Sequence, residues 1–154
     1  MAAHLQSLNV QKYRPPVMPD EAGKLLVSDG SIESTALAAA INSTVGLCVL
    51  PARCVAVDFI LIADDIDAHA DTPTITLSAG VIAANDLVAL TSLLTESTIG
   101  QGGGSARATD IPASLITPND ADRIIGVKVI AGAAVAAAGT LRGILTYRSE
   151  EYGA

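Results

Sequence analysis

The sequence predicts an all-β fold, a β-sandwich with an extended N-terminal arm and at most one short helix. Short apolar runs of strand length alternate with turn-forming residues from position 25 onward, and few segments have helical spacing. A parallel α/β fold needs a helix after almost every strand, so this pattern favours a sandwich or barrel. The 154 residues suit one domain, since domains most often contain about 100–150 residues.

Residues 1–24 form the predicted arm. Pro15, Pro16 and Pro19 are three of the seven prolines of the chain, and proline favours extended backbone and opposes regular strand pairing. Fully extended, such a segment reaches roughly 80 Å. It is therefore either a frayed terminus or an arm that reaches a neighbouring subunit.

The predicted strands begin with residues 25–27, which precede a turn signal at residues 28–30. Residues 32–41 are ambiguous, because their alanines suit a helix while their alternation permits a strand of small residues. Residues 45–50 are predicted to form a short strand that Pro51 closes.

Residues 54–63 give the clearest strand, an apolar run that only Asp58 interrupts. Alternation places four of its side chains on one face: Val55, Val57, Phe59 and Leu61. Residues 74–78 are predicted to form the next strand, with Ile75 and Leu77 facing inward and an interruption at Gly80.

The one predicted helix covers residues 87–94. Its apolar side chains have helical spacing, and Asn85 and Asp86 are good N-cap residues. Residues 100–104, which include four glycines, are predicted to form a flexible loop.

Two β-type runs close the domain, residues 122–130 and 140–148, joined by a connector of small residues at 131–139. The connector has no reactive side chain, so it is either a tight turn or a smooth surface that lies against a neighbour. The predicted organisation is an arm at 1–24, a β-sandwich domain at 25–150 and a short tail at 151–154.

Composition argues against several classes of partner. The formal net charge of −7 and the lack of a basic run disfavour nucleic-acid binding. The chain has no uninterrupted apolar stretch of the roughly 20 residues that a membrane-spanning helix needs, so we expect no membrane partner. The polar N-terminus does not look like a secretion signal, so synthesis in the cytoplasm is expected. Aromatic residues make up only 3%, which argues against a site that stacks on sugars or bases.

Cys48 and Cys54 flank the turn at Pro51, so their side chains could face each other across it. Two cysteines do not define a disulfide framework, and a reducing compartment keeps them as thiols. We expect two buried free thiols rather than a disulfide bond.

An acidic stretch at residues 64–71 is the candidate metal site. Four carboxylates beside His69 could offer oxygen ligands to Ca²⁺: Asp64, Asp65, Asp67 and Asp71. The stretch lacks the central Gly and terminal Glu of an EF-hand loop, and a solvated turn explains it better. We therefore expect no metal and no cofactor.

The chain contains few of the residue types and motifs found in known catalytic sites. His4 and His69 are the two histidines, and neither lies in a sequence motif of a nucleophilic triad or a zinc site. The glycines at 100–104 are not followed by the Gly-Lys-Ser/Thr of a phosphate loop. The expectation is a protein that is not an enzyme.

Taken in order, four segments resemble the decoration or cement proteins of tailed-bacteriophage capsids, which have jelly-roll-like β domains. The segments lie at residues 34–41, 49–62, 64–80 and 122–148. The first looks like a small-residue strand of that family, which favours a strand over a helix there. The chain departs from the family pattern at Arg53, where a glycine after the Leu-Pro-Ala turn is more typical.

The resemblance implies a non-enzymatic virion protein that binds the outer surface of the phage head at subunit junctions and stabilises it. Its implied partners are the major capsid protein and other copies of itself, in a homotrimer. Alternatives are a head-fibre or tail component, or a carbohydrate- or Ca²⁺-binding β module. We expect the partner-binding residues to lie in the arm: Tyr13, Arg14, Pro15, Pro16, Val17, Met18 and Pro19.

Overall fold

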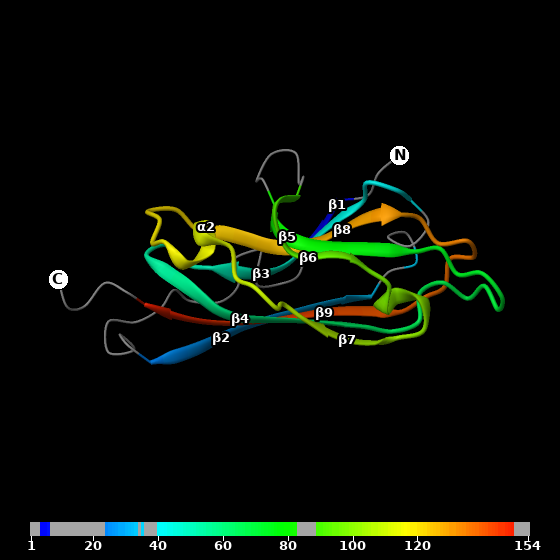
Figure 1. Cartoon of the computed structure of the whole chain (residues 1–154), viewed down its shortest axis with the longest axis horizontal. Coiled ribbons are helices and arrows are strands. Elements are labelled where there is room, and N and C mark those ends of the chain that lie inside the picture. Colours follow the sequence, from blue (N-terminus) through cyan, green and yellow to red (C-terminus); the bar gives the residue numbers. More distant parts are fainter. Residues whose placement is uncertain (1–3, 7–23, 34, 36–39, 83–88, 150–154) are drawn as a thin grey trace.

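Two sheets, antiparallel except at one edge, pack face to face in the computed structural model (Figure 1). It describes residues 4–6, 24–33, 35, 40–82 and 89–149, with only the backbone at 4–6 and 89–91. The strands are β1 (His4–Gln6), β2 (Leu25–Glu33), β3 (Thr44–Leu50), β4 (Cys54–Ala63), β5 (Thr76–Ile82), β6 (Ala89–Ser97), β7 (Gly104–Arg107), β8 (Arg123–Ala131) and β9 (Thr140–Ser149). A 3-10 turn, η2 (Ile99–Gln101), and one helical turn, α2 (Ala113–Ile116), complete the described elements.

The strand order confirms the predicted fold class. One sheet has the order β2-β9-β4-β7, and the other has the order β1-β3-β8-β5-β6. When β2 to β9 are lettered B to I, the sheets read B-I-D-G and C-H-E-F, which is the jelly-roll arrangement. The strand β1 is added at the edge of the second sheet, where it runs parallel to β3.

Aliphatic side chains from both inner faces form the core. Phe59, Leu61 and Leu145 of the first sheet and Leu47 and Ile125 of the second are completely buried. The chain thus forms a sandwich core with a single Phe and no Trp, because branched aliphatic residues fill the space between the sheets.

The strand β4 has the predicted bounds, but its predicted face is wrong at Val57. Val57 is 43% exposed, whereas Phe59 and Leu61 are completely buried. A β-bulge between Ala56 and Asp58 shifts the register against β9 and reverses the alternation before the bulge. The core cluster therefore takes Cys54 and Ala56 before the bulge, and Phe59, Leu61 and Ala63 after it. Val55, which was predicted to face inward, is also buried, at 3% exposed.

The first predicted turn is also wrong. Residues 28–30 lie inside β2, which pairs with β9 without interruption from Leu25 to Glu33. The strand predicted at residues 34–41 is not found at Thr35, Ala40 or Ile41, and the rest of it lies outside the described residues. Nine backbone pairs with β9 outweigh the local turn preference of Asp29 and Gly30.

The predicted helix at residues 87–94 is wrong where it can be compared, because residues 89–97 form the strand β6. The predicted interruption at Gly80 is wrong too, since β5 continues to Ile82. Ile75 and Leu77 are buried, as predicted. The loop predicted at residues 100–104 instead contains the end of η2 and the first residue of β7.

Candidate interaction surfaces

The loops at one end of the sandwich are held together by Asp67. Its carboxylate accepts four backbone N–H hydrogen bonds, from Thr74 (2.7 Å), Ile75 (3.1 Å), Ala134 (3.0 Å) and Val135 (3.0 Å). Asp67 is only 1% exposed, so these bonds replace the water that the carboxylate loses on folding. The carboxylate therefore joins the β4–β5 loop to the β8–β9 connector.

These hydrogen bonds also set the ionisation of Asp67. Burial alone would raise the pKa of its carboxyl group, but the backbone N–H donors favour the charged form and outweigh burial. The pKa of Asp67 is consequently held well below its usual range. Asp67 is thus a permanently charged structural group near neutral pH.

The other candidate ligands of the acidic stretch serve the same loops or face solvent. Asp64 accepts a hydrogen bond from the backbone N–H of Thr140 (2.9 Å), and Asp65 accepts one from the backbone N–H of Asp67 (3.2 Å). Asp71 is exposed. Among the residues that the structure describes, no three His, Cys, Asp or Glu side chains are grouped so that they could hold a metal ion.

The connector of small residues at 131–139 is a turn, the first of the two predicted alternatives, and its contact with a neighbour stays a prediction. Ala68 donates its backbone N–H to the carbonyl oxygen of Val135 (2.8 Å), and Ala137 donates to that of Ile66 (3.1 Å). Val135 remains 49% exposed. The connector is therefore a turn fixed by backbone bonds that presents an uncharged surface.

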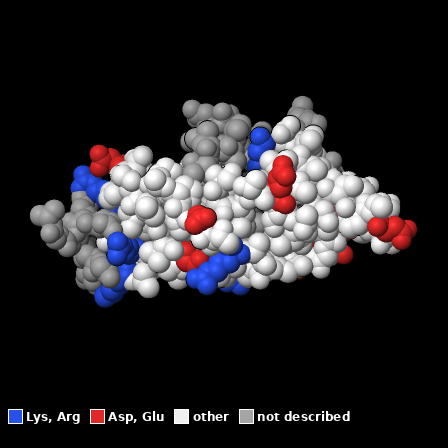
Figure 2. Space-filling model, viewed as in Figure 1, with Lys and Arg blue, Asp and Glu red and all other residues white. Residues whose placement is uncertain are grey.

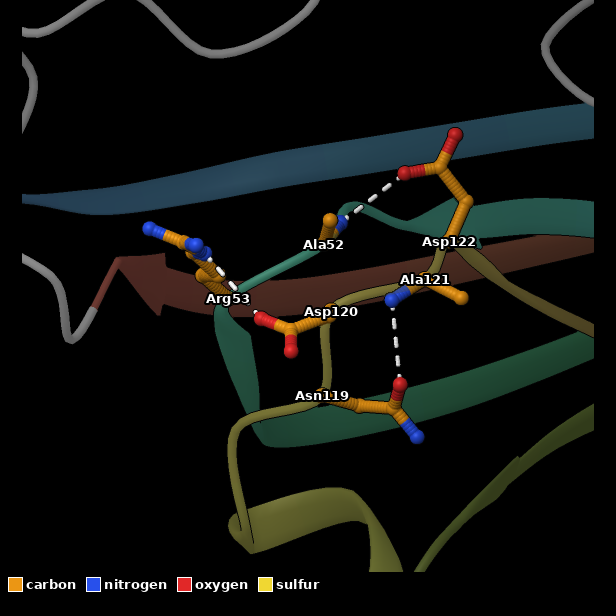
Figure 3. Close-up of polar contacts among 6 residues, drawn as sticks. All are labelled: Ala52, Arg53, Asn119, Asp120, Ala121 and Asp122. Atoms are coloured by element: carbon orange, nitrogen blue, oxygen red, sulfur yellow. Dashed lines mark hydrogen bonds and ion pairs between the residues drawn. The ribbon is translucent and has the colours of Figure 1, made fainter.

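The opposite end of the sandwich is held by polar contacts between the β3–β4 turn and the β7–β8 loop (Figure 3). Asp122 accepts a hydrogen bond from the backbone N–H of Ala52 (2.9 Å), and Asp120 pairs with the Nε of Arg53 (3.2 Å). The backbone N–H of Arg53 donates to the carbonyl oxygen of Asn119 (2.6 Å). Arg53 has a φ of 60°, a conformation that glycine adopts more easily, and this explains why glycine suits that position.

Beneath these contacts lies Arg123, a buried cation that composition gave no reason to single out. Its guanidinium donates to the carbonyl oxygens of Ser114, Thr117 and Cys54, and the side chain is 9% exposed. Burial lowers the pKa of Arg123. A lone Arg at the start of an apolar strand was the only sequence signal for this role.

The outward face of the sheet β2-β9-β4-β7 combines charge pairs with exposed apolar side chains. Arg107 pairs with Asp58 on β4 (2.8 Å), and Arg142 pairs with Asp29 on β2 (3.3 Å). Figure 2 shows most of the Lys and Arg atoms of this view along that lower sheet and at one end of the molecule. Leu25 is 65% exposed and Val27 is 56% exposed, so the edge of this face is apolar.

The predicted partner-binding residues, Tyr13 to Pro19, lie outside the described residues and remain a prediction. Cys48 and Cys54 are buried free thiols, as expected. Burial raises the pKa of Cys48 to about 12, and Asp29 adds to the effect. No helix in the described part of the chain is long and apolar enough to cross a membrane.

No protein-family model and no curated protein sequence matches the chain. Solved structures do. A chain in the capsid of Ralstonia phage GP4 is 36% identical, with a TM-score of 0.78 over 96% of this chain and 98% of that one. A chain in the capsid asymmetric unit of cyanophage Pam1 is 28% identical, with a TM-score of 0.67 over 90% of this chain and 95% of that one.

A third similarity concerns the fold alone. A chain in the acidic stable capsid structure of Helicobacter pylori bacteriophage KHP30 has a TM-score of 0.50 at 12% identity, over 80% of this chain and 86% of that one. The chain from phage GP4 is similar over nearly the full length of both chains, and its 36% identity shows the family. The protein is a virion structural protein and belongs to a family of bacteriophage capsid proteins.

Proposed function

We propose that the protein is a capsid decoration protein, which binds the outer surface of the phage head at subunit junctions and stabilises the shell. The observation that carries the proposal is the 36% identity, over 96% of this chain, to a chain in the capsid of Ralstonia phage GP4. A shell packed with DNA is under outward pressure, and a protein that spans subunit junctions resists it. Many copies make a modest interface strong through avidity.

The positions of the polar side chains support a structural role. Asp67 and Arg123, the most deeply buried charged residues that the structure describes, both bond to backbone groups of loops. They fix the loops at the two ends of the sandwich. Rigid loops lose little conformational entropy when a partner binds them.

In this proposal His4–Gln6 stay paired with β3, and residues 13–19 of the predicted arm contact the major capsid protein. The same protein associates with itself as a homotrimer. Proline limits the conformations of the arm, so that less entropy is lost when it binds.

Cosedimentation with purified capsids that lack the protein tests the function directly. We expect saturable binding and an increase in the temperature or force at which the shell opens. Binding to tails but not to heads, located by immunogold labelling, would assign the protein to another part of the virion and contradict the decoration role.

The arm needs its own test, because a full deletion would also remove β1. Replacement of Val17 and Met18 by serine leaves His4–Gln6 in place. We expect this variant to be folded and at least tenfold weaker in capsid binding. The matched control is Ile116→Ser on α2, which is 54% exposed and far from the arm in sequence. Equal binding by the arm variant and the wild type would remove residues 17 and 18 from the mechanism.

A further inference from the structure

The two sheets have four edges, and three of them are short or irregular. The strand β1 pairs over three residues, and β7 is four residues long. The strand β6 pairs with β5 through three register shifts. Short and bulged edges of this kind resist pairing with other strands.

The fourth edge, β2, is different. It pairs with β9 at nine consecutive positions without a register shift, and within the described residues it has a strand neighbour on one side only. Leu26 and Ile32 pack against the core, while Leu25 and Val27 point outward. Its sequence, LLVSDGSIE, contains no Pro and no Lys, the residues that commonly block an exposed edge.

The edge is also held in place before any partner binds. The hydroxyl oxygen of Ser28 accepts a hydrogen bond from the backbone N–H of Val49 on β3 (3.1 Å), which fixes β2 against the second sheet. Asp29 is bonded to Arg142 on its other neighbour, β9. A strand held in this way can accept another strand with little further loss of entropy.

The charges of β2 argue against pairing with a second copy of itself. A parallel pair in register would place Asp29 opposite Asp29 and Glu33 opposite Glu33. An antiparallel pair over all nine residues would again place Asp29 opposite Asp29. Like charges in directly opposite positions destabilise a strand pair.

We propose that the free edge of β2 accepts an extended strand of the capsid shell protein, which adds to the sheet by main-chain hydrogen bonds. The side chains of β2 define the chemistry of that strand: apolar side chains next to Leu25 and Val27, and Lys or Arg next to Glu33, since Asp29 is already paired with Arg142. This inference rests on the proposed decoration function and specifies its contact. It also places that contact directly after the predicted arm, because β2 begins at Leu25.

A charge on the edge strand tests the proposal. Val27→Lys changes a side chain that is 56% exposed, so the domain should remain folded while the edge becomes unsuitable for pairing. The matched control is Val135→Lys, at a side chain that is 49% exposed on the connector at the other end. We expect binding to decoration-free capsids to fall at least tenfold for Val27→Lys and less than twofold for Val135→Lys.

Amide hydrogen exchange on the full-length protein distinguishes strand addition from a contact of side chains alone. On capsids, the backbone amides of residues 25–33 that face the free edge should exchange at least tenfold more slowly. Unchanged exchange there, or unchanged binding by Val27→Lys, overturns the strand contact while the decoration function stands. Failure of the wild-type protein to bind capsids overturns both. Loss of self-association in Val27→Lys would assign the edge to a second copy and also overturn the proposal.

Discussion

The carboxylate of Asp67 accepts a hydrogen bond of 3.0 Å from the backbone N–H of Val135, a residue 68 positions further along the chain. With the three further N–H donors at Thr74, Ile75 and Ala134, this contact gives the loops at one end of the sandwich a fixed shape. The connector that presents Val135 to solvent is therefore shaped by a carboxylate from a distant part of the sequence.

Asp67→Asn should destabilise the domain by about 2–4 kcal/mol. Asparagine would replace one charged oxygen acceptor with an NH₂ group, which cannot accept a hydrogen bond from the backbone N–H donors. Hydrogen bonds to charged groups contribute about 1.5–3 kcal/mol each. Urea denaturation measures the change. Asp71→Asn is the control, because this exposed carboxylate lies in the same loop, and its effect should stay within about 0.5 kcal/mol. Equal effects of the two substitutions would contradict the assigned role.

The contribution of Asp67 should depend on pH in one direction. Its pKa in the folded protein lies below the unfolded value of about 3.9, so its contribution is fully present above that value. The contribution is lost as the pH falls through the folded pKa. The difference in free energy of unfolding between the wild type and Asp67→Asn should be equal at pH 7 and pH 5 and smaller at pH 3. A difference in free energy of unfolding that stays constant from pH 7 to pH 3 would contradict the role assigned to the charged Asp67 carboxylate.

Arg123→Met should destabilise the domain by about 3 kcal/mol, because the carbonyl oxygens of Ser114, Thr117 and Cys54 would lose a charged donor. Thermal and urea denaturation measure the effect. Arg53→Met is the comparison, since its ion pair with Asp120 is exposed and should contribute less than about 1 kcal/mol. A smaller loss for Arg123→Met than for Arg53→Met would refute this ranking.

Gly126→Ala should be severely destabilising, by at least about 3 kcal/mol. A Cβ atom at this position of β8 would lie 1.9 Å from the carbonyl oxygen of Val45 on β3, and that backbone atom has little room to move. Gly102→Ala is the control, because a Cβ there meets nothing within 4 Å. Soluble expression followed by denaturation compares the two. Normal stability of Gly126→Ala would show that β3 and β8 are not so closely paired there.

Both thiols should be unreactive in the folded protein. Burial raises the pKa of Cys48 to about 12 and also raises the pKa of Cys54, so little thiolate forms at pH 8. Labelling with a thiol-specific reagent should modify neither cysteine until denaturant unfolds the chain, and both afterwards. Fast labelling of either thiol in native conditions would indicate that the turn at residues 51–53 opens.

Several strands could be predicted from the sequence because their pairing in the fold agrees with their local preference for strand structure. The strand β4 has its predicted bounds, β3 differs by one residue, and the closing strands β8 and β9 each differ by one residue at their ends. These strands lie where one or both faces are buried, so apolar residues mark them clearly.

The failures arise where pairing between distant strands departs from the local pattern or overrules it. The strand β6 looked helical because its pairing with β5 contains three register shifts, which break the alternation expected of a strand. The bulge in β4 breaks the alternation in the same way, so Val57 was predicted to face inward although it is exposed. The turn preference of Asp29 and Gly30 was overruled by pairing with β9 over nine residues.

The sequence by itself determined the class of the fold, the absence of known catalytic motifs, and a resemblance to phage virion proteins, because these depend on composition and on local patterns. The tertiary structure decided what the charged residues do. Asp64, Asp65 and Asp67 looked like possible metal ligands, yet their oxygen atoms bond to backbone groups, some of them from residues 134–140. Only the folded chain brings those donors to the carboxylates, and only the order of strands leaves β2 at an edge.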